Sequence, residues 1–396
     1  VEQKWTFHTS MPKARWYPTC VTLPDGKVLI VSGTSSHAHH SLFGGFMNLD
    51  YEIFDPATNT LAEPKKFIDE IEMYPFLQVL PGGTLFVHSK NTTKIWNISD
   101  KKFLHNEQTP KVFHTNIIGT RTYPGMGSCV LLPLKPDSET AKILVVGGST
   151  SLSPDNNTAA TTFAEIFTIN LNNPVDSPGW KRISSQHTQR LLCDSVLLPD
   201  GTVLVTNGAA KGVADDNKDA VREIEVFDPS NGTWTVLDSK LQRDRLYHST
   251  AVLLPDGRVL VAGSTGHNWV RAVFSPQRHF EHEIEIITPP YLYGNPTRPE
   301  INASPSAIRY DTSFEITCST AQDVESVVLI RLSSTTHNNN MDQRYVILSI
   351  IDKRNNLLKI KSPKDGTCAP PGYYMLFLLN DKKIPSIAKF VKLVKE

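Results

Sequence analysis

The chain lacks any excess of charge, any long apolar run and any dense set of cysteines. Its 396 residues carry 40 Lys and Arg against 40 Asp and Glu, so the net charge is zero. A polyanion such as nucleic acid is therefore not expected as a partner. No stretch reaches the ~18–20 consecutive apolar residues of a membrane-spanning helix, so no membrane association is expected. The length allows one large domain and a smaller one.

Cysteine is scarce, with five residues that are too few for a disulfide scaffold and lack metal-site spacing. They are Cys20, Cys129, Cys193, Cys318 and Cys368. Cys318 and Cys368 share the C-terminal region and could pair. An odd number leaves at least one thiol free or bonded to something outside this chain. Helical periodicity is also nearly absent, which favours an all-β fold.

Asn-x-Ser/Thr sequons are numerous for a chain of this length. They begin at Asn91, Asn97, Asn156, Asn231 and Asn302, mostly in polar stretches typical of turns. This pattern predicts a secreted, extracellular glycoprotein with those five asparagines as candidate glycan sites. The chain opens on Val1 without a targeting stretch, which is expected of a processed mature form or of a chain whose front end is missing.

One phrase recurs along the first three quarters of the chain. Close copies occupy residues 21–33, 196–208 and 252–263, and looser copies occupy 79–87 and 131–148. Each copy is an apolar strand, a turn that is Pro-Asp-Gly in the close copies, and a second, β-branched strand. A further strand follows each copy. Four-stranded units repeated every ~40–55 residues predict a β-propeller, and about five blades are visible.

The repeat ends near Tyr291. Residues 299–396 show short antiparallel strands without the repeated phrase, a pattern typical of an immunoglobulin-like sandwich. We therefore expect a β-propeller over residues 1–292, lacking its N-terminal blades, and an immunoglobulin-like β-sandwich domain over residues 293–396.

Four side chains are candidate copper ligands. Tyr17 lies in Arg-Trp-Tyr-Pro-Thr, Tyr247 and His248 in Arg-Leu-Tyr-His-Ser, and His337 in Thr-Thr-His-Asn. Nitrogen and phenolate donors suit a tetragonal Cu(II) site, and a phenol can be oxidised to a radical. One copper ion with one tyrosyl radical can take two electrons from an alcohol or aldehyde without an organic cofactor.

Each of these residues also has a structural interpretation. Tyr74 and Tyr123, like Tyr17 and Tyr247, precede the Leu-Pro turn of a blade. For Tyr74 and Tyr123 we favour a structural role, in which the ring fills the top of the blade. Neighbours on a strand point to opposite faces, so Tyr247 and His248 can reach one ion only at a strand end or bulge. His337 lies in a polar stretch that predicts a hairpin tip, where a lone histidine is usually solvated.

A second histidine cluster stands at His37, His39 and His40. Its Ser- and Gly-rich surroundings indicate a loop. At most, we expect these histidines to line the metal site behind the residues that bind the ion.

With these motifs the chain resembles the copper radical oxidases, and the glyoxal oxidase branch more closely than galactose oxidase. The resemblance covers nearly all 396 residues, with several motifs in the same order. Besides the three phrases above, they are Met73-Tyr74-Pro75-Phe76, Tyr123-Pro124, the stretch from Thr336 to Arg344, the stretch from Pro371 to Phe377, and Ile384-Pro385-Ser386. It implies a kelch-like propeller of seven blades, capped by a sandwich that sends a histidine-bearing hairpin through the channel.

The resemblance also implies site roles. One copper ion is expected on Tyr17, Tyr247, His248 and His337, with Tyr17 similar to the family's radical tyrosine and Tyr247 to its proton-accepting tyrosine. The family takes a primary alcohol or hydrated aldehyde to the aldehyde or acid while O2 becomes H2O2. Small aldehydes or primary alcohols, with O2, are thus the expected substrates. An alcohol oxidase of the galactose type remains an alternative.

One feature departs from the family. Its radical tyrosine is thioether-bonded to a cysteine of the preceding blade, forming a Tyr–Cys cofactor, but no cysteine precedes Tyr17 here. Strand alternation predicts that Cys20 points away from Tyr17. Three explanations for the absent cysteine stay open: it lies on a separate N-terminal fragment of the same protein, it lies on a segment missing from this sequence, or the protein has lost it. The rival hypothesis is a catalytically inactive propeller glycoprotein that binds a carbohydrate or protein partner.

Overall fold

A computed structural model describes every residue except 1–9, 36–45, 69, 107–108, 266–279 and 396. Within this part of the chain the regular structure is β-strand, apart from three short 3₁₀ segments: η2 (Pro174–Asp176), η3 (Pro290–Leu292) and η4 (Ala321–Asp323). The all-β prediction is confirmed. No helix among the described residues has the length and hydropathy to cross a bilayer.

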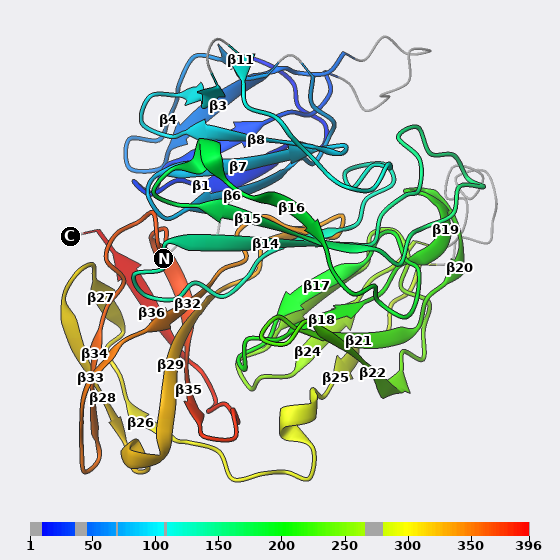
Figure 1. Ribbon diagram of the computed structural model, residues 1–396. Helices are drawn as coiled ribbons and strands as arrows, with labels where there is room; N and C mark the ends of the chain where they lie inside the picture. The colour runs from blue at the N-terminus through cyan, green and yellow to red at the C-terminus, as the bar shows by residue number, and fades with distance from the viewer. Residues whose placement is uncertain (1–9, 36–45, 69, 107–108, 266–279, 396) are drawn as a thin grey trace.

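Five antiparallel sheets follow one another along the chain and form propeller blades (Figure 1). Blades 1 and 2 contain β1 (Thr19–Thr22), β2 (Val28–Val31), β3 (Asp50–Asp55), β4 (Thr60–Leu61) and β5 (Lys65–Lys66), then β6 (Phe76–Leu80), β7 (Thr84–Ser89), β8 (Thr92–Asn97), β9 (Lys102–Phe103) and β12 (Phe113–His114). Blade 3 contains β13 (Ser128–Leu131), β14 (Thr140–Val146), β15 (Ala164–Asn170) and β16 (Gly179–Arg182). Blades 4 and 5 contain β17 (Asp194–Leu197), β18 (Val203–Thr206), β21 (Glu223–Asp228) and β22 (Thr233–Lys240), then β23 (Thr250–Leu253), β24 (Val259–Ala262) and β25 (Glu285–Ile287). The first strand of each blade is innermost, since β1 contacts β6, β13 contacts β17, and β17 contacts β23.

The predicted Pro-Asp-Gly turns join the first and second strands of three blades. Gly26, Gly201 and Gly257 sit there with φ of +86°, +87° and +84°, a region that glycine enters without a steric penalty. These turns face the C-terminal domain, because a Cβ on Gly26 would lie 3.3 Å from Pro371 and one on Gly257 3.5 Å from Pro385. The opposite ends of the inner strands are left for the site.

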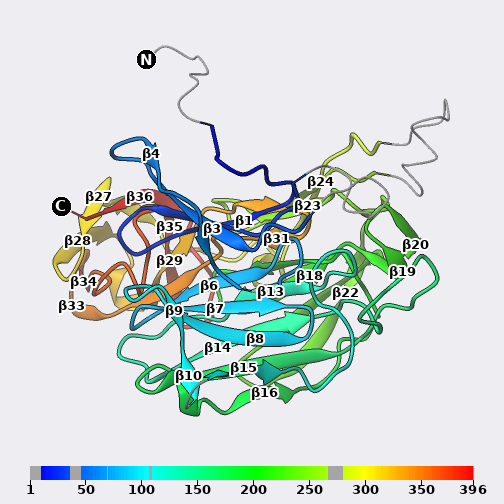
Figure 2. The same ribbon diagram turned by 90° about the horizontal axis from the view of Figure 1, so that it is seen from above.

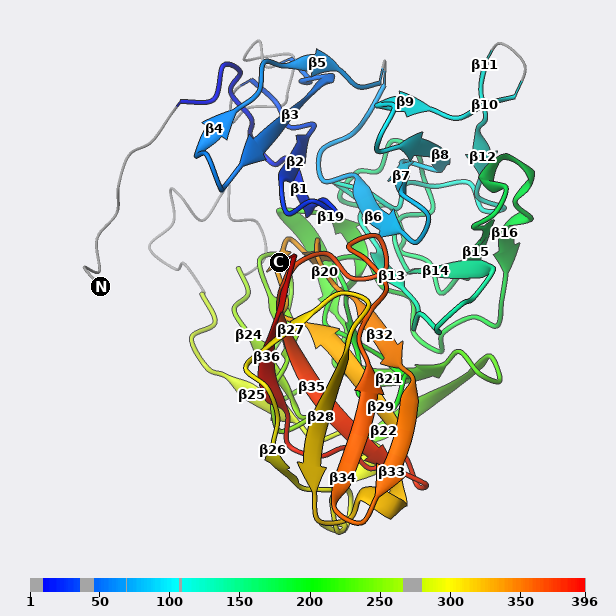
Figure 3. The same ribbon diagram turned by 90° about the vertical axis from the view of Figure 1, so that its left-hand side faces the viewer.

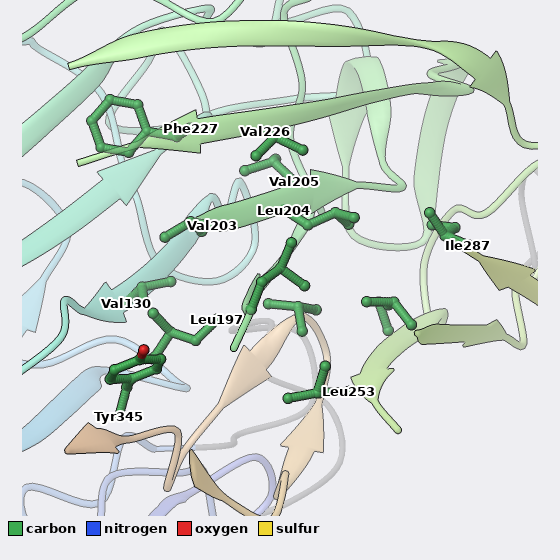
Figure 4. Packing of buried hydrophobic residues seen from close by; sticks show 14 of the residues in the cluster. Val130, Leu197, Val203, Leu204, Val205, Val226, Phe227, Leu253, Ile287 and Tyr345 are labelled. Atoms are coloured by element: carbon green, nitrogen blue, oxygen red, sulfur yellow. The ribbon is translucent and has the colours of Figure 1, made fainter. Parts of the chain in front are cut away.

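The C-terminal domain is a sandwich of two sheets, seen in Figure 3. One sheet orders β26 (Ile301–Ala303), β28 (Ser313–Cys318), β34 (Leu357–Lys361) and β33 (Ile350–Arg354). The other orders β27 (Ala307–Arg309), β36 (Lys389–Val394), β35 (Gly372–Asn380), β29 (Val324–Arg331) and β32 (Tyr345–Leu348). The core between propeller and sandwich is continuous, because Tyr345 belongs to the same buried cluster as Val130 and Leu197 (Figure 4). Its hydroxyl donates to the carbonyl oxygen of Pro199 at 2.6 Å.

Within the described residues, three two-stranded hairpins stand outside these sheets. They are β10 (His105–Asn106) with β11 (Thr109–Pro110), β19 (Ala209–Val213) with β20 (Asp216–Ala220), and β30 (Thr335–Thr336) with β31 (Asn339–Asn340). The last one extends from the sandwich to the inner strands, where β30 contacts β23 and β31 contacts β13 (Figure 2). This is the hairpin predicted to carry His337.

The suggested pairing of Cys318 with Cys368 is wrong, since all five cysteines are free. Cys318 is buried in the sandwich core, with its Sγ 3.5 Å from Oγ1 of Thr320. Cys368 lies in the loop before β35, where its main-chain N–H donates to Asp365. A shared domain does not bring two Cβ atoms to the ~4 Å separation that a disulfide needs.

Candidate metal centre

The four predicted ligands meet at one end of the inner strands. The Tyr247 hydroxyl donates to the Tyr17 hydroxyl at 3.1 Å, and the Nε2 atoms of His248 and His337 lie 3.0 Å apart. The His337 ring centroid is 4.4 Å from that of Tyr17 and 5.3 Å from that of Tyr247. Blade 1, blade 5 and the sandwich hairpin thus supply two phenols and two imidazoles to one place.

Left-handed residues turn the chain toward this place. Tyr17, Tyr74, Leu192 and His248 have φ of 63°, 49°, 56° and 64°, and each stands two residues before the inner strand of its blade. Such φ values are uncommon for residues other than glycine. The turn interrupts strand alternation, which is why Tyr247 and His248 can both face the site although they are neighbours.

The hairpin tip also contains residues with positive φ angles. His337 and Asn338 form the two-residue turn between β30 and β31, with φ of 50° and 61°. Two consecutive positive φ angles are the requirement of a type I′ turn, whose twist matches that of a hairpin. The hairpin prediction is confirmed, and its tip is where the histidine side chain is presented.

A buried arginine precedes the inner strand in four blades and pairs with a glutamate on the blade's third strand. The pairs and their N–O distances are Arg15–Glu52 at 2.5 Å, Arg121–Glu165 at 3.4 Å, Arg190–Glu225 at 2.6 Å and Arg245–Glu285 at 2.8 Å. The arginines also donate to main-chain oxygens at the end of the second strand, those of Ser32, Gly147, Asn207 and Gly263. Sequence reasoning missed this frame. The sequence pattern that could have predicted it is Arg-x-Tyr, which recurs in three blades and is seen at Arg15-Trp16-Tyr17 and Arg245-Leu246-Tyr247.

Electrostatics keep the metal-free site neutral. Burial raises the pKa of the Tyr17 and Tyr247 phenols. Burial lowers the pKa of His248 and, with His248 nearby, lowers the pKa of His337 to about 3. At neutral pH both imidazoles are therefore uncharged and each offers one lone pair to a metal.

The donor set fits a copper ion. Two ligand atoms about 2.0–2.1 Å from an ion and at right angles lie about 3 Å apart. This agrees with the 3.1 Å between the two phenol oxygens and the 3.0 Å between the two imidazole nitrogens. The described residues contain no group of three or more His, Cys, Asp or Glu that could hold a metal. The phenols are therefore needed to complete a four-donor site, and such N,O donors suit Cu(II).

The site is open on one side. The side chain of His248 is exposed, Tyr17 and His337 are half-buried, and Tyr247 is only 1% exposed. Trp16 is 38% exposed, and its ring centroid lies 5.0 Å from that of Tyr17. A small solute can therefore reach the two imidazoles and Tyr17 beside an aromatic wall.

Cys20 does not point away from the site, as strand alternation had predicted. Its side chain packs, like that of Tyr17, against the buried cluster that contains Tyr247 and Met341. Its main-chain N–H lies 3.3 Å from Sδ of Met341. The prediction was wrong because it assumed regular alternation, whereas Tyr17 is left-handed.

Tyr74 and Tyr123 flank Tyr17. The Tyr74 ring stacks on that of Tyr17 with centroids 4.9 Å apart, and the Tyr123 ring meets it edge-on at 5.4 Å. Both are buried, so they do fill the tops of their blades, but they do so against the proposed radical tyrosine. The cluster of His37, His39 and His40 lies outside the described residues.

The five sequons remain predicted glycan sites. Asn231 and Asn302 are exposed, whereas Asn91, Asn97 and Asn156 are half-buried. The Asn156 amide donates to Asp216 at 2.8 Å.

Sequence models of two families cover nearly the whole chain. "Glyoxal oxidase N-terminus" matches residues 2–291, and "Galactose oxidase-like, Early set domain" matches residues 298–393.

Several curated proteins are similar over most of this chain. "Aldehyde oxidase GLOX" of Vitis pseudoreticulata is 30% identical, over 96% of this chain and 72% of its own length. A "WSC domain-containing protein" of Arthroderma benhamiae is 31% identical, over 97% and 40%. "Galactose oxidase" of Gibberella zeae is 29% identical, over 99% and 56%. The chain thus spans between 40% and 72% of the length of these relatives.

Among solved structures, one similar chain is described as "Novel fungal alcohol oxidase with catalytic diversity among the AA5 family, in complex with copper". It matches with a TM-score of 0.77 and 24% identity, over 97% of this chain and 76% of its own. At that identity the match supports the fold.

Proposed function

The chain belongs to the glyoxal oxidase family of copper radical oxidases, and from this premise we propose that it oxidises small aldehydes or primary alcohols while reducing O2 to H2O2. The observation that carries the proposal is that three separate elements bring together two phenols, with oxygens 3.1 Å apart, and two imidazoles, with Nε2 atoms 3.0 Å apart. Relatives named aldehyde oxidase and galactose oxidase support the substrate class.

Tyr17, Tyr247, His248 and His337 hold the copper ion in this proposal. Copper supplies a Lewis acid and, paired with an oxidised phenol, a two-electron oxidant when it is bound. Tyr17 carries the radical, because its ring contacts three other aromatic rings and is partly accessible. Tyr247 accepts the substrate's hydroxyl proton at its Oη, in the role of a general base.

The reaction balances without a further co-reactant. A primary alcohol loses two hydrogens to become an aldehyde, and a hydrated aldehyde loses two to become an acid. O2 takes up the two electrons and two protons as H2O2. The chain's part is to place the substrate hydroxyl beside Tyr247 Oη and its carbon beside the Tyr17 ring.

The Tyr–Cys form of the radical cofactor is part of the proposal. Peptide mass spectrometry on the native copper-loaded protein tests it. The expected product is a Tyr17 peptide joined to a cysteine peptide and two hydrogens lighter than their sum. An unmodified Tyr17 peptide in a copper-loaded sample would remove this cofactor and favour the inactive binding propeller.

Extracellular location is proposed as well, supported by the five sequons. Enzymatic deglycosylation of the native protein should lower its mass. An unchanged mass would remove the support that the sequons give.

The copper site itself is tested by His337→Ala. The substitution removes one of two imidazole donors, so copper-dependent H2O2 formation from a panel of small aldehydes and primary alcohols should be lost. His114→Ala, at an exposed histidine of β12, is the matched control and should keep activity. Wild-type H2O2 formation by His337→Ala would overturn the assignment, and turnover of galactose alone would favour the galactose-type alternative.

A further inference from the structure

A chain of hydrogen bonds begins on the side of His337 that faces away from the ligand cluster. Its Nδ1 lies 2.7 Å from Oγ1 of Thr336, while its Nε2 faces Nε2 of His248. The Thr336 hydroxyl also interacts with the phenol of Tyr74 and lowers the pKa of that phenol, against the raising effect of burial. The order is therefore imidazole, hydroxyl, phenol, and it links the sandwich hairpin to blade 2.

Tyr74 is held firmly enough to anchor that chain. It is 5% exposed, and its main-chain N–H donates to the carbonyl oxygen of Tyr17 at 3.2 Å. Its ring stacks on the Tyr17 ring at 4.9 Å and on the His337 ring at 4.7 Å, with interplanar angles of 25° and 30°. One residue thus contacts a ligand from the propeller and a ligand from the sandwich.

The chemistry of imidazole gives these contacts a function. A neutral imidazole carries one N–H, and only the other nitrogen has a lone pair for a metal. The Thr336 hydroxyl can accept a hydrogen bond from Nδ1–H of His337 and donate its own proton toward the Tyr74 oxygen. In this arrangement the hydroxyl acts once as acceptor and once as donor. Nε2 of His337 is then unprotonated before any metal arrives.

We propose that Thr336 and Tyr74 are positioning residues that hold His337 in its Nδ1–H tautomer, with the Nε2 lone pair directed at the copper site. The proposal deepens the proposed function, on which it rests for the identity of the metal. The tautomer is a property of the metal-free protein and can be measured separately. Partners of this kind behind a metal-bound histidine typically change metal affinity 10–100-fold when they are removed.

The hairpin supplies its own control. Thr335 is the neighbour of Thr336 in β30, and its buried Oγ1 has no hydrogen-bond partner in the described structure. Replacing either threonine by valine makes the same change of shape and polarity in the same strand. Only Thr336→Val removes a partner of His337.

The first measurement uses metal-free protein labelled with ¹⁵N-histidine, and it reads the tautomer of His337 from the imidazole nitrogen shifts. Wild type, Thr336→Ser and Thr335→Val should show the Nδ1–H form. Thr336→Val should show a mixture with the Nε2–H form. A pure Nδ1–H form in Thr336→Val would overturn the proposal.

The second measurement is Cu(II) affinity by competition with a chelator at fixed pH. Affinity should fall on the order of 10–100-fold in Thr336→Val and less in Tyr74→Phe, recover in Thr336→Ser, and stay unchanged in Thr335→Val. An equal loss in Thr335→Val would assign the effect to the fold of the hairpin and overturn the proposal. Wild-type protein that binds copper with the expected variant pattern but forms no H2O2 would instead refute the proposed function alone.

Discussion

Single residues in the left-handed region direct the side chains of the site. Tyr17, Tyr74, His248 and His337 share positive φ angles of 49–64°, a conformation that costs about 1–3 kcal/mol each outside glycine. Main-chain hydrogen bonds hold the neighbouring segments, since Tyr74 N–H donates to Tyr17 at 3.2 Å and Thr265 N–H donates to Tyr247 at 2.7 Å. The ligands are therefore placed by the backbone before a metal binds, which reduces the ordering that binding has to impose.

The charge of Asp215 acts on the two phenols of this site. It lies in the turn between β19 and β20, next to the buried Ala214, whose N–H donates to the carbonyl oxygen of Pro124 at 3.0 Å. Ala214 belongs to the same buried cluster as Tyr247. Beyond the effect of burial, the carboxylate raises the pKa of Tyr17 and Tyr247. Because this charge acts at the phenols, we expect it to disfavour an anionic substrate there.

Asp215→Asn should therefore relax a preference for uncharged substrates. We expect kcat/KM for an aldehyde that carries a carboxylate to rise on the order of tenfold relative to a neutral aldehyde, and more at low salt. Asp219→Asn changes an exposed carboxylate of the same hairpin and should leave the ratio unchanged. A ratio that does not move in Asp215→Asn would place the carboxylate outside the substrate's path.

At the scale of elements, the Arg–Glu pairs join each inner strand to the third strand of its blade. Arg245 and Arg190 have fully buried side chains and occupy the same place in blades 5 and 4. His248, a proposed ligand, stands three residues after Arg245, whereas Leu192, which cannot bind a metal, stands two residues after Arg190. The same frame therefore stands directly before two proposed ligands in blade 5 and before none in blade 4.

Arg245→Lys and Arg190→Lys keep the charge but lose the guanidinium fork that bonds carboxylate and carbonyl together. Both should lower the free energy of unfolding by about 1–3 kcal/mol, measured by urea denaturation. Arg245→Lys should weaken Cu(II) binding more than Arg190→Lys, because the proposed ligands Tyr247 and His248 stand two and three residues after Arg245. Equal copper affinities in the two variants would show that the frame does not position the ligands.

The sequence predicts those features that local patterns determine. The Pro-Asp-Gly phrases predict the blades, and the motifs around Tyr17, Tyr247 and His337 predict which side chains gather at the candidate metal centre. Contacts that depend on which strands become neighbours could not be predicted, such as the bond from Arg15 to Glu52 or that from Asn338 to Asp194. The predictions for Cys20 and for the Cys318–Cys368 pair failed for a related reason. The Cys20 prediction assumed regular strand alternation, which the positive φ of Tyr17 interrupts. The disulfide prediction assumed that two cysteines of one domain lie close together, whereas the packing of the two sheets keeps them apart.

At the scale of the whole molecule, the site depends on the sandwich being seated on the propeller. Gln343 fixes the base of the hairpin, because its Oε1 accepts from Leu197 N–H at 2.8 Å and its Nε2 donates to Ser195 at 2.9 Å. Nearer the tip, the Asn338 amide donates to Asp194 at 2.9 Å. Both contacts lie on β17, so blade 4 holds the hairpin although it supplies no ligand.

Asp194 makes this junction sensitive to pH. Burial raises its pKa from 3.8 to about 7, against the opposing effect of bonds from Asn207 and Asn338. Between about pH 4 and pH 7 the folded protein keeps a proton that the unfolded chain has released. The stabilising contribution of this group is therefore complete below pH 4 and is lost as the pH rises to 7, at up to about 1.4 kcal/mol per pH unit.

Asp194→Asn removes this titration while keeping the shape of the side chain. Urea denaturation of wild type and Asp194→Asn at pH 5 and pH 7 should show the wild type losing stability relative to the variant by about 2 kcal/mol over that interval. The slope must come from Asp194, because all other titrating groups are common to both proteins. A constant difference would mean that the carboxylate is ionised throughout. The bonds from Asn207 and Asn338 would then outweigh its burial, and the hairpin would be held by a charge rather than by a protonated acid.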